Sequence, residues 1–263
     1  MLGIRILVAL IGIPILLGAS FLGGWWLTLL VSGIAYLGLL EFYRLAARMD
    51  LKPLTAAGVL GGVLLIITAY TAMDMISRLA VLFTVGLLFI YLFYFPRLGL
   101  ADIAVTLLGI WYLGGLLAHL LMIRFLPDGG RALIMTFLFT WVYDTGAYFC
   151  GCLFGRQHPW PQISPRKTVA GVIGGFIGIL ILIVTLGPLF LPLRLDFWMV
   201  LFLAVIVVAA AQMGDLVGSA LKRQAGVKNS GWLLPGHGGI LDRFDSLLLV
   251  APVIYYYLAF CLA

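Results

Sequence analysis

Charged residues are scarce in this chain. Asp, Glu, Lys and Arg make up 10% of its 263 residues, whereas hydrophobic residues make up 64%. A soluble domain carries roughly 25% charged residues, so the composition excludes an ordinary soluble protein. It predicts an all-α fold with several membrane spans, each of about 20 apolar residues. The first apolar run continues past residues 18–20 into further apolar sequence, which favours an uncleaved span over a signal peptide.

Cysteine is also scarce, and its spacing excludes two common roles. The chain has three cysteines, Cys150, Cys152 and Cys261, all in or beside apolar runs. The number is odd, and no pair has the C-x-x-C spacing found in many metal and redox sites. We therefore expect buried free thiols, and neither a disulfide framework nor a cysteine metal site.

The apolar sequence divides into nine segments, which predicts nine transmembrane helices. Short polar links separate the segments and leave no room for a soluble domain. We expect residues 1–130 to form a scaffold of helices and residues 131–263 to carry the functional site. The segments run roughly over residues 4–22, 25–46, 54–73, 78–96, 101–126, 131–151, 169–191, 197–221 and 243–262.

The distribution of Lys and Arg predicts the orientation of these spans, because cytoplasmic loops carry an excess of both. If the N-terminus is cytoplasmic, twelve of the sixteen Lys and Arg residues fall on the cytoplasmic side. The four that remain outside are Arg78, Arg124, Arg131 and Arg194. We therefore expect a multi-pass protein of the inner or plasma membrane, with its functional site facing the cytoplasm and its C-terminus outside. The net charge of +6 favours anionic lipid headgroups or nucleotides as partners.

A polar, glycine-rich stretch lies between the last two apolar segments, at residues 215–246. Such a stretch is costly at a bilayer surface unless it binds a ligand. Its acids are oxygen ligands that suit Mg²⁺, and they are Asp215, Asp242 and Asp245. Its basic residues suit phosphate groups, and they are Lys222, Arg223, Lys228 and Arg243. Its glycines let backbone N–H groups approach an anion closely, and they are Gly236, Gly238 and Gly239.

Helical spacing groups several of these side chains. Residues three and four apart share one face of a helix. Asp215, Ser219 and Lys222 therefore line one face of the eighth segment, and Asp242 and Asp245 line one face of the ninth. We expect Asp215 and Asp242 at two helix ends that flank the basic loop, where they can hold a cation against the phosphates of a ligand. Acids gathered at one membrane face, and not at the midplane, argue against a transporter.

A further acid, Asp144, lies near the end of the sixth segment, with Tyr148 one turn along the same face. An ionisable residue in a membrane segment is a functional candidate, although pairing with an arginine of the next loop would also explain it. That loop, residues 155–168, is stiffened by three prolines. Ser164 or Thr168 can cap the seventh segment. The free N–H groups at the start of that segment would then favour a bound phosphate. The alternative is an ordinary helix cap without a ligand.

Two other features of the apolar segments carry weaker signals. Glu41 is an acid at depth near a cytoplasmic end. It is either part of a solvated helix end close to Arg44 or a residue that supports the functional site. The glycines of the seventh segment are three and four residues apart, which predicts close packing against another helix. They are Gly171, Gly174, Gly175 and Gly178.

The stretch 219–245 resembles the signature of the phosphatidate cytidylyltransferases, also called CDP-diacylglycerol synthases. That signature has the form S-x-hydrophobic-K-R, four residues, K-D, and then P-x-H-G-G-hydrophobic-x-D-R-hydrophobic-D. This chain reads Ser219-Ala-Leu221-Lys222-Arg223, then Lys228-Asn229, then Pro235-Gly-His237-Gly238-Gly239-Ile240-Leu-Asp242-Arg243-Phe244-Asp245. The stretches Asp144–Tyr148 and Ser164–Thr168 also resemble parts of the family. The first half of the chain is similar to it only in hydropathy.

The resemblance implies the reaction CTP + phosphatidic acid → CDP-diacylglycerol + pyrophosphate, with Mg²⁺ held by Asp215 and Asp242. It implies a catalytic group made of these two acids with Lys222, Arg223 and Asp245. We assign substrate binding to Asp144, Ser164, Lys167, Thr168, Ser219, Lys228, His237, Gly238, Gly239 and Arg243. His237 either contacts a phosphate or shapes its turn. The expected partners are CTP, phosphatidic acid, membrane lipids and a second copy of the chain, with no nucleic acid.

Three departures from the family pattern keep other functions open. Asn229 stands where the signature has Asp, and Gly218 and Ala170 stand where related sequences often carry Glu. The absence of these three acids would lower the activity or alter its dependence on metal. The alternatives are a CTP-dependent lipid or polyprenol kinase, a cytidylyltransferase for another lipid phosphate, an ion-path protein and an inactive membrane scaffold.

Overall fold

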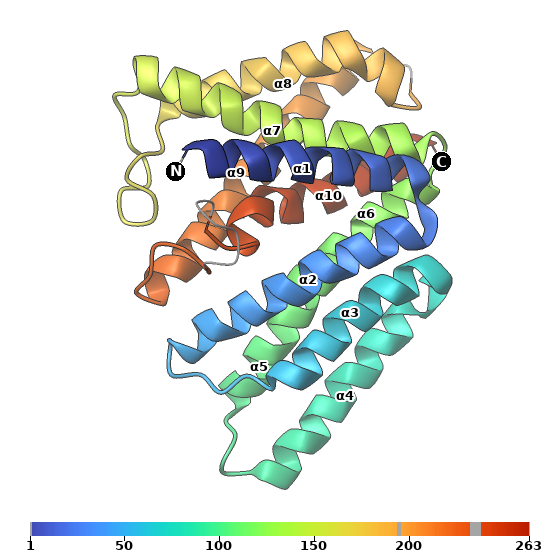
Figure 1. Cartoon of the computed structure of the whole chain (residues 1–263), viewed down its shortest axis with the longest axis vertical. Coiled ribbons are helices and arrows are strands. Elements are labelled where there is room, and N and C mark those ends of the chain that lie inside the picture. Colours follow the sequence, from blue (N-terminus) through green and yellow to red (C-terminus); the bar gives the residue numbers. More distant parts are fainter. Residues whose placement is uncertain (1, 194–195, 232–237, 263) are drawn as a thin grey trace. The chain divides into compact units, whose positions relative to one another are not determined.

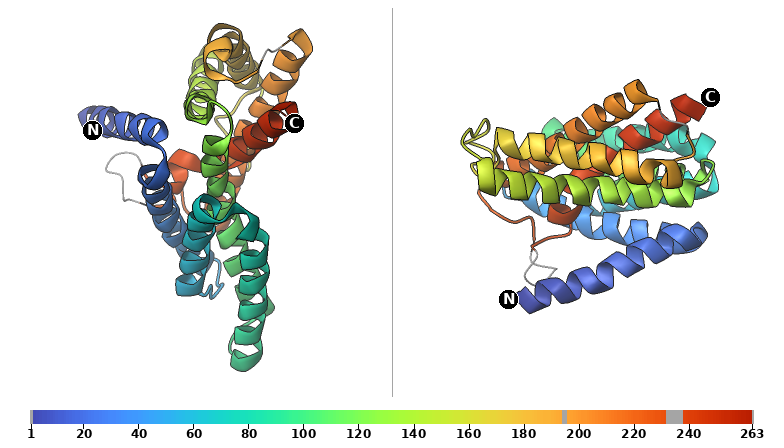
Figure 2. Two further views of the ribbon diagram at one scale, coloured as in Figure 1. Left: turned by 90° about the vertical axis from the view of Figure 1, so that its right-hand side faces the viewer. Right: turned by 90° about the horizontal axis from the view of Figure 1, so that it is seen from above.

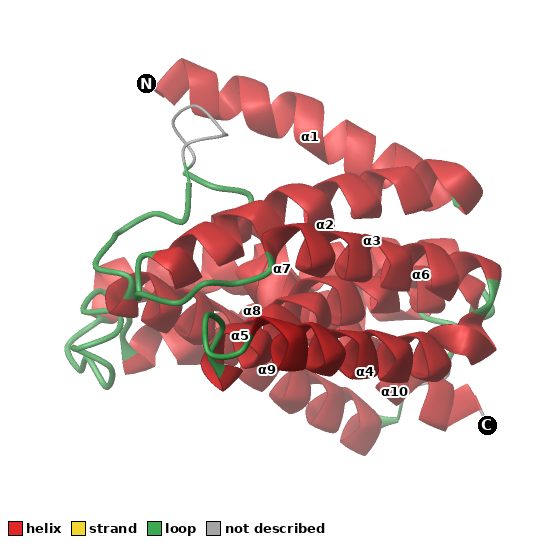
Figure 3. Ribbon diagram, turned by 90° about the horizontal axis from the view of Figure 1, so that it is seen from below, coloured by secondary structure: helices red, strands yellow, loops and turns green. Residues whose placement is uncertain are grey.

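The described part of the chain is built from helices. A computed structural model describes residues 2–193, 196–231 and 238–262, and side chains from residue 10 onward. Within these ranges the elements are helices joined by links, without a strand (Figure 3). In chain order they are α1 Leu2–Leu22, α2 Gly24–Ala47, α3 Thr55–Thr71, η1 Met73–Met75, α4 Ile76–Tyr94, α5 Leu100–Gly109, η2 Ile110–Gly115, α6 Leu116–Phe125, α7 Gly129–Phe154, α8 Val169–Phe190, α9 Phe197–Gln224 and α10 Leu241–Leu262 (Figure 1). The predicted all-α fold is confirmed.

Six helical stretches are long and apolar enough to cross a membrane. They are Gly24–Ala47, Met73–Tyr94, Leu100–Phe125, Val169–Phe190, Phe197–Gln224 and Leu241–Leu262. These six coincide with six of the nine apolar segments of the sequence. The other three segments contain α1, α3 and α7. The described apolar part of α1, Leu10–Leu22, and α3 are shorter, and α7 is not among the six. A multi-pass membrane protein is supported, whereas nine spans and a cytoplasmic N-terminus stay predictions.

Two helix ends near the candidate site have clear local causes. Thr168 begins α8, and its Oγ1 accepts a hydrogen bond from the backbone N of Gly171 at 3.1 Å. This satisfies one of the N–H groups that the first turn of a helix leaves unpaired. Gly226, just after the end of α9, has a φ of 67°, which glycine adopts without the steric cost that other residues incur. The predicted cap at Thr168 is therefore confirmed.

The chain forms two compact units. The first comprises Met1–Met122 with Gln224–Arg243, and the second comprises Ile123–Arg223 with Phe244–Ala263. In the first unit, α2 and α3 lie side by side and both contact η2 (Figure 1). A Cβ on Gly58 or Gly109 would overlap the ring of Tyr43, so these glycines admit the buried tyrosine. Its hydroxyl donates to the backbone O of Thr106 at 2.8 Å, which ties the end of α2 to α5.

In the second unit, α7 and α8 lie along each other (Figure 2). A Cβ on Gly174 would overlap the Cys150 side chain, and a Cβ on Gly175 would overlap the Tyr143 ring. The predicted close packing of this glycine face is confirmed. The Tyr143 hydroxyl donates to Gln212 Oε1, which joins α7 to α9. The unit thereby holds α9, which carries Asp215, against the helix that precedes the proline-containing loop.

The cysteines are free, but they are not all buried. Cys150 and Cys261 are half-buried and Cys152 is exposed, so the expectation of burial is wrong for Cys152. Cys150 contacts the glycine face of α8. Cys152 lies two residues further along α7, roughly 200° around the helix axis, and therefore points to the other side.

Candidate functional site

Asp215 is the centre of a polar cluster in the second unit. Its side chain is 32% exposed, and its Oδ2 lies 2.7 Å from Lys167 Nζ. Its Oδ1 accepts a hydrogen bond from Ser219 Oγ at 3.2 Å. The predicted shared face of Asp215 and Ser219 on α9 is confirmed. The Asp215 carboxylate therefore already binds one cation, the ammonium group of a residue from another segment.

Backbone contacts in the loop at residues 155–168 hold Lys167 beside Asp215. The backbone N of Ser164 donates to Trp160 O at 2.9 Å, and the backbone N of Lys167 donates to Ser164 O at 3.2 Å. Arg223 Nε, on the last turn of α9, donates to Ile163 O at 3.2 Å. Ser164 thus lies inside the loop, and the residue that caps α8 is Thr168 and not Ser164. Arg223 was expected among the phosphate ligands, and in the structure its hydrogen bond to Ile163 O helps to hold the loop in place.

Asp245 extends this cluster from α10. The residue is 9% exposed, and its Oδ1 accepts a hydrogen bond from the backbone N of Ser246 at 2.8 Å. Its charge interacts with those of Asp215, Lys222 and Asp144. A Cβ on Gly218 would lie 3.0 Å from Asp245 Cβ, so the absence of a side chain at 218 lets α9 and α10 approach closely. Six charged residues predicted for the site therefore belong to the second unit: Asp144, Lys167, Asp215, Lys222, Arg223 and Asp245.

Asp242 belongs to the first unit, where other residues of the polar stretch hold its carboxylate. Its Oδ2 accepts hydrogen bonds from the backbone N of Ser230 at 2.9 Å and the backbone N of Gly239 at 3.0 Å, and lies 3.1 Å from Ser230 Oγ. Gly238, which precedes this contact, has a φ of 82°, and a Cβ there would crowd Asp242 Oδ2. The N–H of Gly239, expected to bind a substrate anion, binds the carboxylate of Asp242 in this structure.

Glu41, whose role the sequence left open, also contacts the residues around Asp242. Glu41 is 2% exposed, and its carboxylate accepts hydrogen bonds from the backbone N of Ile240 at 3.0 Å and of Leu241 at 2.9 Å. Ser230 Oγ donates to Glu41 Oε2 at 2.8 Å. The interpretation as part of a solvated helix end beside Arg44 is wrong, because the carboxylate is buried and its partners come from the signature stretch. An acid within an apolar run was the only sequence signal for this role.

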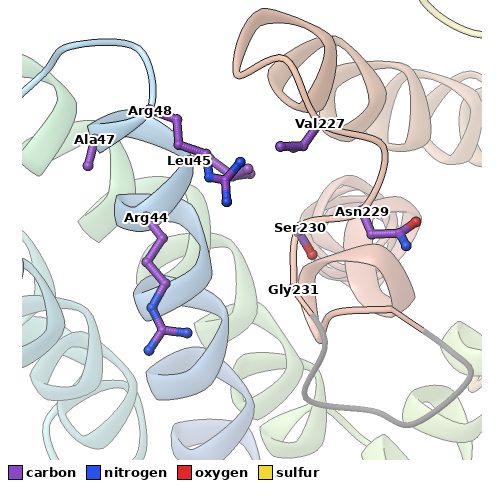
Figure 4. A pocket seen from close by; sticks show the side chains of 8 residues that line it. All are labelled: Arg44, Leu45, Ala47, Arg48, Val227, Asn229, Ser230 and Gly231. Atoms are coloured by element: carbon purple, nitrogen blue, oxygen red, sulfur yellow. The ribbon is translucent and has the colours of Figure 1, made fainter.

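A pocket of about 400 Å³ opens between the end of α2 and the segment after α9, both in the first unit. Figure 4 draws Arg44 and Arg48 on one side of it, and Asn229 and Ser230 on the facing segment. Its lining residues are Arg44, Leu45, Ala47, Arg48, Val227, Asn229, Ser230 and Gly231. Two arginines without a carboxylate among these eight residues favour an anionic ligand. The sequence had assigned neither arginine to a ligand: both counted toward membrane orientation, and Arg44 was also a possible neighbour of Glu41.

The remaining predicted residues differ in their surroundings. Asp144, Lys228 and Arg243 are exposed, and Lys222 is half-buried. His237 lies outside the described residues, as does Gly236. No group of three or more His, Cys, Asp or Glu side chains in the described ranges is arranged to hold a metal ion. Asp215 and Asp242 belong to different units, so their joint metal site stays a prediction.

The donor chemistry of the two acids fits Mg²⁺. Asp215 binds an ammonium group and a hydroxyl, and a third of its side chain is accessible. Asp242 has one oxygen fixed by hydrogen bonds, which orients its carboxylate. Proteins usually bind this ion beside phosphates through one or two carboxylates, which neighbouring hydrogen bonds hold in one orientation.

Comparisons with known proteins identify the family of this chain. The model of the cytidylyltransferase family matches residues 3–261. The chain belongs to the cytidylyltransferase family. It is 36% identical over 257 residues to a phosphatidate cytidylyltransferase of Staphylococcus haemolyticus, with 95% of this chain and 96% of that protein covered. It is 31% identical to one of Synechocystis, with 98% and 97% covered. The resemblance seen in residues 219–245 is thus confirmed, and the match extends over the first half of the chain, where hydropathy alone had suggested it.

Proposed function

We propose that this protein transfers the cytidylyl group of CTP to phosphatidic acid. The full-length similarity to proteins named phosphatidate cytidylyltransferases supports this assignment. The observation that carries the assignment of the site is the pair formed by Lys167 and Asp215. It joins Ser164–Thr168, a stretch that resembles the family, to Asp215, which lies four residues before the stretch 219–245. The carboxylate and the ammonium group that it brings together suit a phosphate-transfer site.

The reaction makes limited demands on the protein. A phosphate oxygen of phosphatidic acid attacks the α-phosphorus of CTP and forms a new P–O bond. The bond between the α-phosphorus and the bridging oxygen breaks, and pyrophosphate leaves with the electron pair. No protein nucleophile is needed, so the side chains position the two substrates and neutralise charge. Lys167 and Lys222 are the cations of the Asp215 cluster, and we assign them to phosphate oxygens.

We assign the metal site to Asp215 and Asp242. Bound there, Mg²⁺ would neutralise charge on the phosphates and on the leaving pyrophosphate. The backbone N–H groups of Ser230 and Gly239 hold Asp242 in one orientation, and Ser219 and Lys167 hold Asp215. Asp245 is buried beside Gly218, which lies one turn after Asp215 on α9. We assign it a supporting role in the Asp215 cluster, where it packs α10 against α9.

We assign the pocket at the end of α2 to a phosphate-bearing part of a substrate. Arg44 and Arg48 are four residues apart and therefore on one face of the helix. Two like charges at this spacing repel, and a bound phosphate offsets that cost. Ser230, which lines the pocket, also contacts Asp242. The pocket is therefore next to one of the acids assigned to the metal.

The membrane arrangement follows from the charge distribution. We propose nine spans in the inner or plasma membrane, with the polar stretch facing the cytoplasm, where CTP is available. The lipid substrate reaches the same interface from the bilayer. We also expect a homodimer, which a mass measurement on detergent-solubilised protein tests directly.

The decisive experiment is product analysis with purified protein, phosphatidic acid vesicles and labelled CTP. Label in the α-phosphate should enter the lipid, and pyrophosphate should be released in equal amount. Transfer of label from the γ-phosphate to the lipid would instead identify a CTP-dependent kinase. Turnover should require Mg²⁺ and should stop on chelation. Absence of any transfer with saturating substrates and Mg²⁺ would favour an inactive scaffold.

A further inference from the structure

A buried carboxylate that the proposed mechanism does not use connects α2 to the signature stretch. Glu41 is 2% exposed, and burial of a charge this complete is costly unless hydrogen bonds replace its water. Three groups do so. They are the backbone N–H groups of Ile240 and Leu241 and the hydroxyl of Ser230. All three belong to the stretch that precedes or begins α10.

The backbone N–H groups of the two residues before α10 and of its first residue are divided between two carboxylates. Ile240 and Leu241 donate to Glu41, and Gly239 donates to Asp242. These groups have no acceptor within the helix, and the positive end of the helix dipole favours negative charge there. The start of α10 is therefore fixed by one carboxylate from a distant helix and one from its own first turn.

Ser230 links the two acids. Its backbone N donates to Asp242 Oδ2, while its Oγ lies 2.8 Å from Glu41 Oε2 and 3.1 Å from Asp242 Oδ2. A hydroxyl has one hydrogen to donate, and the shorter distance favours Glu41 as its acceptor. Glu41 therefore helps to fix Ser230, and Ser230 in turn helps to fix the carboxylate of Asp242.

Two glycines provide independent evidence that the backbone is built closely around Glu41. A Cβ on Gly231 would overlap the Glu41 carboxylate, and a Cβ on Gly239 would overlap both Glu41 Oε2 and Ser230 Oγ. The segments before and after the undescribed residues 232–237 thus both contact one side chain of α2. Such an arrangement leaves little freedom for the residues that hold Asp242.

We propose that Glu41 is a positioning residue, which orients Asp242 for metal binding through Ser230 and the start of α10. The inference rests on the proposed function only in taking Asp242 as a metal ligand. Glu41 itself contacts neither metal nor substrate. Residues that orient a metal ligand typically contribute 10- to 100-fold to metal affinity or activity.

The test compares Glu41→Gln with a matched control in the same unit. Asp102 is also a buried acid that accepts backbone hydrogen bonds, from Lys52 at 2.6 Å and Gly99 at 2.8 Å, but it has no described contact with residues 224–243. Gln replaces one acceptor oxygen of Glu41 with an NH₂ group, which cannot accept from Ile240, Leu241 or Ser230. Asp102→Asn makes the same change where no metal ligand depends on it.

The readout is binding of Mn²⁺ to purified protein, measured by electron paramagnetic resonance, which requires no turnover. We expect Glu41→Gln to weaken Mn²⁺ binding by at least about tenfold, and Asp102→Asn to leave it within about twofold. Equal weakening by both variants, or wild-type binding by Glu41→Gln, would overturn the proposal. If Glu41→Gln cannot be recovered from membranes, Ser230→Ala decides: weaker Mn²⁺ binding supports the proposal and unchanged binding overturns it. Cytidylyl transfer by the wild type tests the proposed function separately.

Discussion

Lys167 Nζ lies 2.7 Å from Asp215 Oδ2, although Lys167 lies in the proline-containing loop and Asp215 lies on α9. Both side chains are partly buried, with 17% and 32% of their surface exposed. An ion pair of this kind is less screened by water and salt than one on an open surface. The loop is therefore part of the Asp215 cluster.

We expect Lys167→Ala to lower cytidylyl transfer by at least about tenfold, which corresponds to ~1.4 kcal/mol. The substitution removes the cation that is paired with Asp215 and is assigned to a phosphate. Steady-state kinetics with CTP and phosphatidic acid measures the effect. Arg166→Ala is the matched control, because Arg166 is the exposed neighbour in the same loop and should retain near wild-type turnover. Unchanged turnover and unchanged KM in Lys167→Ala would remove the loop from the site.

The arginine pocket provides a second prediction. The double variant Arg44→Gln, Arg48→Gln should raise the KM of the substrate whose phosphate binds there by roughly three- to tenfold. This is the scale of one or two charge-assisted hydrogen bonds at a partly exposed site. Separate titrations of CTP and phosphatidic acid identify that substrate. Arg97→Gln, which changes an exposed arginine outside the pocket, is the control. If neither KM changes in the double variant, the two arginines serve only membrane orientation.

The orientation of the protein gives a third prediction, independent of chemistry. In a background without the three native cysteines, a cysteine at residue 263 should react with a membrane-impermeant thiol reagent added from outside. A cysteine in place of Gln224, which is exposed at the end of α9, should react only after the membrane is opened. These outcomes follow from twelve Lys and Arg residues on the cytoplasmic side. The reverse labelling pattern would move the candidate site to the other side of the membrane.

The helices and the Asp215 cluster were accessible to sequence reasoning for physical reasons. Apolar runs are a one-dimensional signal, and the helical repeat fixes which residues share a face, as for Asp215 and Ser219. A side-chain cap such as Thr168 is also local in sequence. The ion pair with Lys167 joins different segments, and resemblance to a family, not spacing, suggested that the two stretches belong together.

The role of Glu41 shows what the sequence does not contain. Two of its three partners are backbone N–H groups, which every residue except proline carries. Nothing in the identity of Ile240 or Leu241 indicates that a distant carboxylate binds there. Burial of Glu41 likewise depends on helix packing, which a single sequence does not specify. An acid in an apolar run predicts a function without predicting which one.

The metal assignment gives the last prediction. We expect Asp215→Asn and Asp242→Asn each to leave less than about 1% of wild-type turnover, a loss of ~2.7 kcal/mol or more in transition-state stabilisation. Asparagine keeps the size of the side chain and can still accept a hydrogen bond, so the loss would report charge and not packing. Membrane expression should be unchanged. Turnover across a range of Mg²⁺ concentrations is the measurement.

The double variant distinguishes one shared metal from two separate roles. If Asp215 and Asp242 hold the same ion, removal of either disables it, and the double variant should be little worse than either single variant. If the acids act independently, the two losses in free energy should add. Strict additivity of the two aspartate substitutions, or substantial Mg²⁺-dependent turnover in either single variant, would exclude a shared metal, and the two carboxylates would then have separate functions.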